Sequence, residues 1–478
     1  MLFNSLEFYI FFPLVTLIYF LLPYRFRWFH LLLASCIFYA AFIPAYLLIL
    51  FFTIIIDYIA GIYIENAVGA RRKVLLVISL ISNIGILAIF KYYNFFAANL
   101  NLLFHHIPIL KIILPIGLSF HTFQAMSYTI EVYRGNQKAE KHFGIYALYV
   151  MFYPQLVAGP IERPQNLLHQ FREKFDFDYT RVTSGLRLML WGFFKKIVIA
   201  DRLGIVVDKI YDDPHSHNSL SLLLATIFFS FQIFCDFSSY SDIAIGAARV
   251  MGFKLMKNFN KPYHARSIAE FWQRWHISLS TWFRDYLYIS LGGNRVSVPR
   301  WYFNLFFVFL VSGFWHGANW TFIIWGALHG FYLIFALVTQ KARNRVFPAI
   351  GLKKPVWLEV ITTYLLVTFA WIFFRAGSVQ DACYIIKNIF TGIPWMISSL
   401  KNHRSIFEYY GLDKWELMLS FGLILLLEVI HVFQNRIAVT DWFNARPAYF
   451  RLGLYVCVIV SLVFLAANSS KAFIYFQF

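Results

Sequence analysis

The sequence predicts an all-α integral membrane protein, and three observations support that fold class. Hydrophobic residues make up 60% of the 478 positions and charged residues only 14%, whereas about a quarter of an ordinary soluble domain is charged. Residues 301–340 contain no Lys, Arg, Asp or Glu, and a stretch of that length suffices for two helices of ~20 residues across a bilayer. The apolar runs are long and continuous, whereas a membrane barrel has short alternating segments.

The formal net charge of +18 restricts the possible partners. In a helical membrane protein, Lys and Arg are expected in excess in cytoplasmic loops, so the charge requires no nucleic acid, and we predict no such partner. The same charges would attract an anionic cytosolic substrate, such as a coenzyme that carries a nucleotide. The composition leaves both contributions open.

Apolar windows of ~19 residues define the predicted elements from the N-terminus onward. The first stretch has no cleavage site of small residues after it and precedes Arg25 and Arg27, so we predict a retained helix. These arginines and the basic stretches 71–73 and 341–345 are expected in the cytoplasm. No repeat or linker interrupts the chain, so we predict one polytopic domain over 1–478 with roughly eleven to thirteen spans. The windows are 6–22, 28–42, 44–62, 74–91, 107–130, 143–158, 186–207, 219–235, 302–318, 321–339, 356–374, 415–433 and 450–467.

Two long segments, 159–185 and 254–300, interrupt this pattern of short loops. The second contains eight basic residues and two acids. Within it, apolar residues recur every three to four positions, as on one face of a helix. A basic, Trp-rich amphipathic helix is predicted to lie at the cytoplasmic interface or to plug a cavity there. The residues of that face are Phe271, Trp275, Leu279, Trp282 and Tyr286.

The first candidate for chemistry is His316, within the uncharged stretch 301–340. An ionisable side chain in an apolar span is costly and marks a functional site by default. Gly313 and Gly317 flank it, so another backbone or a substrate can come close. Neutral imidazole accepts a proton near neutral pH, and a general base contributes about 10²–10⁴-fold to a rate. A histidine that only bonds a carbonyl of the next helix fits equally well, and His329 is a weaker candidate of the same kind.

The second candidate, His276, lies beside Trp275 in the basic segment. Alone it is typical of an ordinary histidine at a membrane interface. Its importance rises if the amphipathic segment folds into the same cavity as His316.

Acidic residues near the apolar spans allow two interpretations. Asp236 and Asp242, with the hydroxyl side chains between them, could hold a cation or carry protons. Ser and Asp side chains more often bond helix ends, and we favour that structural role. Asp57 is predicted to pair with a basic residue or a helix terminus.

The sequence lacks several motifs that are typical of other membrane-protein and enzyme classes. It has no Gly-rich phosphate loop, no Cys/His metal spacing and no Gly-x-Ser-x-Gly nucleophile motif. An ATP-driven pump and a serine hydrolase are therefore disfavoured, and no metal site is predicted.

The candidate residues lie in blocks that resemble the membrane-bound O-acyltransferase (MBOAT) superfamily, and within it the bacterial alginate O-acetyltransferase branch. The most specific blocks are Phe-Trp-Gln-Arg-Trp-His-Ile-Ser-Leu-Ser-Thr-Trp-Phe-Arg-Asp-Tyr at 271–286 and Trp-His-Gly at 315–317. Further matches lie at 1–13, 114–134 and 155–161. The resemblance therefore extends over nearly the whole chain.

The resemblance implies a fold and a site. The fold is a ring of transmembrane helices with interfacial helices around a thin centre, where a cytoplasmic funnel leads into a catalytic tunnel. His316 would be the catalytic residue and His276 its companion, at a position that is often Asn or Asp in other branches. We expect substrate contacts from residues in or beside the same blocks: Trp275, Ser280, Arg284, Asp285, Trp315 and Asn319.

The resemblance also implies a reaction in the bacterial inner (plasma) membrane. A cytosolic acyl thioester, acetyl-CoA in the first place, would be the donor, and the basic segment 254–300 would attract its phosphates. No tightly bound cofactor is expected. His316 would activate a hydroxyl acceptor, and the acetyl group would pass to an exported, alginate-like polysaccharide. Such transfer often involves a periplasmic or extracellular partner of the SGNH-hydrolase-like type.

Two alternatives remain at the level of the sequence. One keeps the enzyme class but changes the acceptor, with D-alanyl transfer to teichoic acid or acylation of peptidoglycan or a lipid. The other is a transporter with His and Asp relays. The absence of an internal repeat and the Trp-rich segment argue against the transporter.

Overall fold

The computed structural model describes residues 1–104, 106–349, 355–401, 414–437, 439–467 and 472–474. Within these ranges the chain forms helices and no strand, so the predicted all-α class is confirmed. Six of the described helices are long and apolar enough to cross a membrane. The protein is therefore a multi-pass helical membrane protein. The six are α3 (Tyr46–Asn66), the continuous α4–η1–α5 (Gly69–Phe104), α11 (Ser219–Met251), α15 (Trp320–Val338), α17 (Val356–Arg375) and α20 (Lys414–Arg436).

The remaining helices are shorter or interrupted. Two of them, α1 (Leu6–Leu21) and α22 (Ala448–Phe464), are apolar along their length. The others are α2 (Tyr24–Ala40), α6 (Leu118–Arg134), α7 (Phe143–Met151), α8 (Pro164–Leu167), η2 (Leu168–Arg172), α9 (Tyr179–Phe193), η3 (Phe194–Ala200), α10 (Asp201–Tyr211), η4 (Pro214–Ser216), α14 (Val298–His316), α16 (Gln340–Ala349), α18 (Val379–Thr391), α19 (Ile393–Lys401) and α21 (Val439–Asn444).

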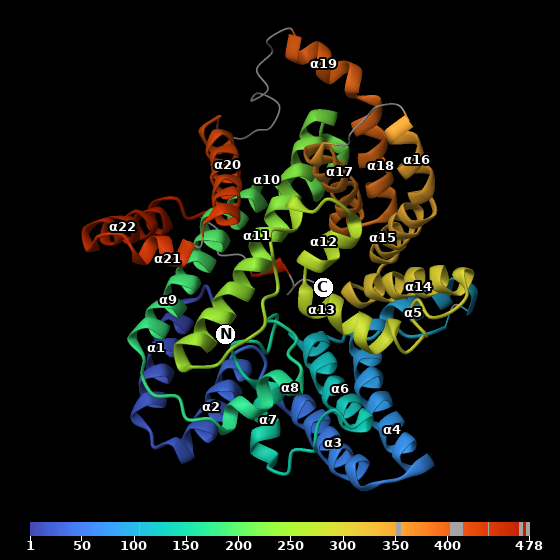
Figure 1. The fold of residues 1–478 in the computed structure, drawn as a ribbon. Helices are drawn as coiled ribbons and strands as arrows, with labels where there is room; N and C mark the ends of the chain where they lie inside the picture. Colours follow the sequence, from blue (N-terminus) through green and yellow to red (C-terminus); the bar gives the residue numbers. More distant parts are fainter. Residues whose placement is uncertain (105, 350–354, 402–413, 438, 468–471, 475–478) are drawn as a thin grey trace.

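Helix α11 forms the centre of the molecule. Of its most apolar window, 83% is buried, against 17–39% for the other five long helices. It packs against α9, α10, α17 and α18, because a helix that is apolar on all sides must be surrounded by others. Figure 1 shows α11 crossing the middle of the fold, with α1–α4 on one side and α17–α20 on the other.

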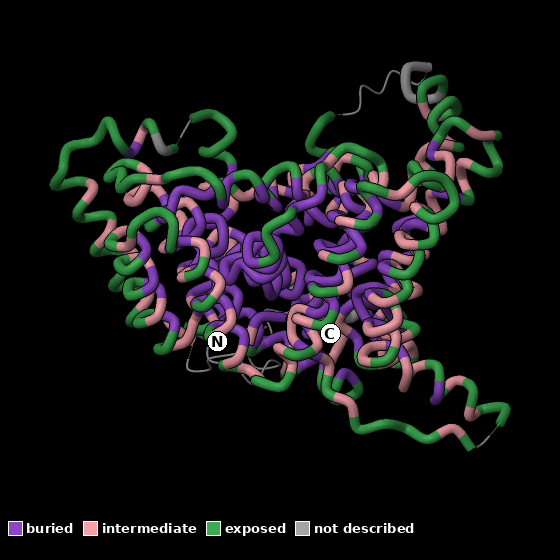
Figure 2. Tube along the Cα trace, turned by 90° about the horizontal axis from the view of Figure 1, so that it is seen from below, coloured by how far each residue is buried: buried purple, intermediate pink, exposed green. Residues whose placement is uncertain are grey.

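The outer helices present apolar side chains to the surroundings. Figure 2 shows the buried residues gathered in the centre and the exposed residues around them. Leu48, Ile81 and Leu425 are among many large apolar side chains that are exposed on these helices. An apolar surface of this extent marks an interaction site, and on spanning helices a lipid bilayer covers it.

The two carboxylates of α11 pair with lysines of η3, a π-helical turn. Lys196 Nζ lies 2.6 Å from an oxygen of Asp236 and 2.8 Å from one of Asp201. Lys195 Nζ lies 2.8 Å from Asp242. Burial makes each of these charges depend on its partner. Asp236 and Asp242 thus pair with lysine side chains from within α11, and not with the helix ends that the sequence analysis favoured.

The prediction for Asp57 is wrong. Its carboxylate accepts hydrogen bonds from Ser79 Oγ at 2.6 Å and from Asn83 Nδ2 at 2.8 Å, both on the neighbouring α4. Helix α4 thus supplies neutral donors where we had expected a base or a helix terminus. A buried carboxyl group can be satisfied by such donors without a paired charge.

The predicted amphipathic helix is broken into short pieces between α11 and α14. The pieces are η5 (Pro262–His264), α12 (Ile268–Arg274), α13 (Ile277–Trp282) and η6 (Phe283–Tyr288). At the break, Ile277 N–H donates to Asn258 O, and Arg274 O accepts from Asn260 N–H. These bonds to the preceding segment of the chain replace the bonds that would continue α12. All five residues of the predicted apolar face are nevertheless buried, and irregular backbone is tolerated at membrane depth where protein surrounds it.

Candidate active site

His316 is the last residue of α14, at the bend of a tight helical hairpin with α15. The predicted approach of another backbone occurs at Gly313, where a Cβ would lie 2.3 Å from the Phe322 carbonyl oxygen. The His316 side chain is 3% exposed. Its ring centroid lies 5.1 Å from that of Trp325 and 5.4 Å from that of Phe374. The imidazole therefore faces the interior of the protein and not the outer apolar surface.

Lys91 and Tyr92 hold the backbone at the end of α14. Lys91 Nζ donates to Trp315 O at 2.6 Å and to His316 O at 3.0 Å. Tyr92 Oη donates to Phe314 O at 3.1 Å. The last carbonyls of a helix lack partners within the helix, and a cation there also complements the helix dipole. These bonds fix the backbone from which the His316 imidazole projects.

His276 is held in a left-handed backbone conformation, with φ of 43°. Its Nδ1 lies 3.2 Å from Asn258 Oδ1. The same oxygen accepts from Ser278 Oγ at 2.9 Å, while Asn258 Nδ2 donates to Ser241 Oγ at 3.0 Å. These bonds set the orientation of the amide, so the network assigns the proton of His276 to Nδ1 and the acceptor lone pair to Nε2. Burial lowers the pKa of His276 well below its usual value and keeps the ring neutral.

The structure brings His276 and His316 together around the indole of Trp315. The ring centroid of Trp315 lies 6.4 Å from that of His276 and 4.9 Å from that of His316. The broken amphipathic segment thus enters the same part of the interior as His316. The sequence analysis gave His276 more importance in that case.

A cavity of about 460 Å³ lies between the broken segment and the α14–α15 hairpin. Ser280 and Ser312 line it, and these are the residues four after His276 and four before His316. Neither histidine lines the cavity itself. Four residues make about one helical turn, so the cavity reaches within a turn of both histidines. Its walls are mainly apolar, and Arg284 and Arg343 also line it. The volume is within the range of small-molecule sites.

The structure places the other predicted substrate-contact residues in different surroundings. Ser280 and Arg284 line the cavity, and Asp285 accepts a hydrogen bond from Arg284 Nε at 2.8 Å. Trp315 lies between the histidines, as described above. Trp275 instead packs its ring against Trp371, at a centroid distance of 5.1 Å.

Asn319 and His329 serve local structure. Asn319 caps α15, where its side-chain oxygen accepts from Thr321 N–H at 3.0 Å. His329 Nδ1 accepts from Trp272 Nε1 at 3.3 Å, which ties α15 to α12. Neither residue is among those that line the cavity.

Comparison with known proteins decides the family. The model of the membrane-bound O-acyltransferase family matches residues 142–376. The peptidoglycan O-acetyltransferase of Helicobacter pylori is 34% identical over 94% of this chain and 91% of its own. The chain belongs to the MBOAT family. A probable alginate O-acetylase AlgI of Pseudomonas aeruginosa is 38% identical over 84% of this chain and 77% of its own. A teichoic acid D-alanyltransferase of Streptococcus thermophilus is 30% identical over 50% of this chain and 61% of its own.

The family identifies this MBOAT protein as an acyltransferase and confirms the predicted fold and enzyme class. Both histidines and the cavity-lining serines fall inside the matched residues 142–376. The sequence interpretation missed Lys91, although a lone lysine in an apolar span is the same signal that identified His316. It also missed Asn258, which no local pattern marks.

Proposed function

We propose that this MBOAT protein moves an acetyl group from a cytosolic thioester of the acetyl-CoA type to a hydroxyl group of an exported polysaccharide, with His316 as general base. One observation carries the proposal. Two neutral histidines from distant segments meet around Trp315, and the next helical turn from each lines one cavity. A donor in that cavity would lie within a turn of the group that removes a proton.

The reaction follows from these positions. His316 takes the proton from the acceptor hydroxyl as its oxygen bonds to the carbonyl carbon of the thioester. The carbon–sulfur bond then breaks, and the thiolate leaves and is protonated. His276, with Nε2 as its accepting nitrogen, orients the acceptor through a hydrogen bond from a second hydroxyl group of the sugar. A neutral ring suits both roles, because a protonated imidazole has no lone pair to offer.

The cavity supports the choice of donor. Its mainly apolar walls suit the thioester arm, and Arg284 and Arg343 suit the phosphates of a coenzyme. Both arginines lie at the end of the hairpin where positive charge predicts the cytoplasm. The enzyme then needs no bound cofactor, because the donor is consumed as a substrate.

The relatives support the choice of acceptor. Two relatives that match most of the chain are a peptidoglycan O-acetyltransferase and a probable alginate O-acetylase, and both names concern carbohydrate hydroxyls. The D-alanyltransferase matches only half of the chain, so acetyl transfer is preferred. Location in a bacterial inner membrane, with an SGNH-like partner on the far side that assists transfer to the polysaccharide, belongs to the same proposal.

The test uses purified protein in lipid nanodiscs with acetyl-CoA labelled in the acetyl group. Alginate oligosaccharides and peptidoglycan fragments serve as acceptors in parallel reactions. We expect label on the oligosaccharide, and a fall of about 10²–10⁴-fold in the rate for His316→Ala. His215→Ala is the matched control, because His215 is exposed and pairs with Asp381 far from the cavity. Full transfer by a folded His316→Ala protein would refute His316 as the base, and label on neither acceptor would refute the proposed reaction.

A further inference from the structure

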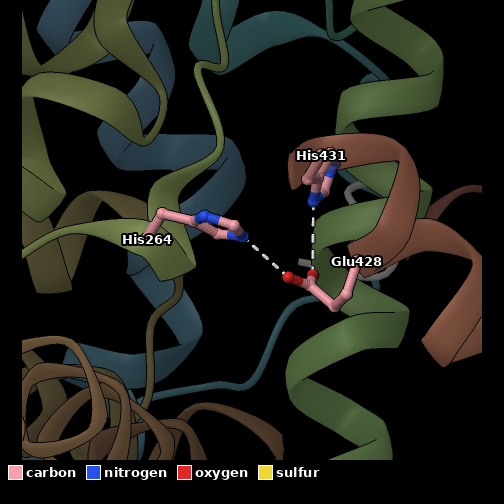
Figure 3. Close-up of side chains that lie close together, drawn as sticks. All are labelled: His264, Glu428 and His431. Atoms are coloured by element: carbon pink, nitrogen blue, oxygen red, sulfur yellow. Dashed lines mark hydrogen bonds and ion pairs between the residues drawn. The ribbon is translucent and has the colours of Figure 1, made fainter. Parts of the chain in front are cut away.

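Three potential metal ligands converge away from the cavity, where η5 meets α20. His264 Nε2 lies 2.7 Å from Glu428 Oε2, and His431 Nδ1 lies 3.2 Å from Glu428 Oε1. Figure 3 shows both imidazoles pointing at the one carboxylate. The ligand atoms all lie within 4.8 Å of one another, and this is the only such group of three or more among the residues that the structure describes.

We propose that His264, Glu428 and His431 bind a divalent ion of the Zn²⁺ type, which joins α20 to the turn before α12. Two imidazoles and one carboxylate are a ligand set that zinc accepts, at bond lengths of about 2.0–2.2 Å. Such bonds place neighbouring ligand atoms roughly 3–4 Å apart. The separation of His431 from Glu428 lies in that range, and a shift of His264 by a few tenths of an ångström would bring its 2.7 Å contact into it. A fourth position stays open for water, as in zinc sites with three protein ligands.

The secondary structure presents the ligands on one side. Glu428 and His431 are three residues apart on α20 and therefore lie on the same face of that helix. His264 ends the short turn η5, which begins after Lys261 in a left-handed conformation with φ of 47°. Among described non-glycine residues, only Lys261 and His276 have a positive φ. Such backbone persists where surrounding bonds hold it, and a metal bond from His264 is one bond that would hold this turn.

The surroundings orient the ligands and leave access for an ion. The ring of His431 packs edge-on against Phe234, with 5.5 Å between centroids, so its rotation is restricted. The side chains of His264 and Glu428 are 23% and 30% exposed. The ammonium group of the nearby Lys261 is engaged by Asn435 Oδ1, which gives that positive charge a partner outside the cluster.

An ion pair without a metal is the competing explanation. In it, the two histidines would each donate a hydrogen bond to Glu428, and no ion would be needed. The two explanations differ in what the protein contains, because a metal site binds an ion in a ratio of about one per chain. They also differ in how a chelator acts, since an ion that binds only the folded state stabilises it.

The experiment measures metal in the intact protein, purified in detergent through an affinity tag that contains no histidine. We expect about one zinc per chain, a fall in the thermal midpoint after chelation, and its recovery on adding Zn²⁺. Co²⁺ added to the chelated protein should give the visible absorption of a tetrahedral site. Glu428→Gln and His264→Gln should lose both the ion and the response to chelation.

His215→Gln is the matched control, because His215 also faces a carboxylate, that of Asp381 at 3.3 Å, but belongs to a pair and not to a group of three. It should keep the ion. Wild-type protein without zinc, Co²⁺ absorption or a chelator response would overturn the proposal. An ion that survives in folded Glu428→Gln would do the same. Acetyl transfer is not part of this readout, so the result is independent of the proposed reaction.

Discussion

Two histidine groups share the irregular segment between α11 and α14 (residues 252–297) but have opposite surroundings. His276 and His316 lie among aromatic rings, and the partner of His276 is the neutral amide of Asn258. His264 and His431 converge on the carboxylate of Glu428. An imidazole in an apolar, neutral site stays uncharged and keeps a lone pair for a proton. Beside a carboxylate, an imidazole can join that carboxylate in binding a metal ion. The neighbours, and not the residue type, therefore assign the role.

The largest expected effect separates the two groups by activity. His276→Ala should lower acetyl transfer by about 10²–10⁴-fold, because the acceptor loses its orienting partner beside the base. His264→Ala should retain transfer, because His264 contacts Glu428 and not the rings around Trp315. Initial rates with labelled acetyl-CoA, on samples matched for folded protein, make the comparison. Equal losses in the two variants would remove the distinction between the groups.

The second prediction gives His276 a carboxylate neighbour, like the one that His264 and His431 have in Glu428. Asn258→Asp places a carboxylate 3.2 Å from His276 Nδ1, where the amide oxygen now lies. The new negative charge raises the pKa of His276, so the ring becomes protonated and Nε2 ceases to accept. We expect transfer to fall by about 10–100-fold near neutral pH, the range seen when partners that orient a functional histidine are changed.

A rate profile against pH checks this prediction. Transfer by Asn258→Asp should recover as the pH rises and the proton leaves His276, whereas the wild-type rate should not rise over the same range. Ser278→Ala is the control, because it removes one donor to Asn258 Oδ1 but leaves the bond to His276. A flat profile for Asn258→Asp would mean that the charge state of His276 does not matter.

The third prediction concerns the backbone below His316. Lys91→Met removes the ammonium that bonds the Trp315 and His316 carbonyls. Each buried carbonyl left without a donor costs about 1–3 kcal/mol, so the folded state should lose roughly 2–6 kcal/mol for the two carbonyls. The kcat should fall while KM stays nearly constant, because the imidazole is displaced but the cavity is intact. Lys111→Met, at an exposed lysine, is the control for the loss of a charge. Identical denaturation curves for the two variants would contradict the role of Lys91.

The sequence predicts the fold class and His316, but not the break at His276 or the group around Glu428. Composition and pattern predict the fold class, since so apolar a chain with long, continuous apolar runs forms spanning helices, whereas a barrel has short alternating segments. His316 is found because an ionisable group in an uncharged stretch is rare. The break at His276 is not found, because the periodicity of 271–286 is that of a helix and the bonds that interrupt it come from Asn258 and Asn260. The group around Glu428 is not found either, because His264 lies 164 residues away from it in the sequence.

The smallest expected effect concerns Glu162, which contacts the segment between α11 and α14 at Met256. Glu162 is fully buried, and its carboxylate accepts a hydrogen bond from Met256 N–H at the start of that segment. Burial raises the pKa of Glu162 from 4.5 to about 7. Between these values the folded protein binds a proton that the unfolded chain releases, so folding is favoured fully below pH 4.5 and less as the pH rises through 7.

Glu162→Gln should therefore flatten the dependence of stability on pH. The neutral amide keeps an oxygen for Met256 N–H but has no proton to lose. We expect the thermal midpoint of the wild type to fall between about pH 5 and pH 8, and that of Glu162→Gln to fall less, because the carboxylate contribution is gone. Glu173→Gln is the control, since that side chain is half exposed and pairs with His169. If both variants follow the wild-type curve, Glu162 is ionised throughout, and the segment is held at Met256 by a charged group, as at Glu428.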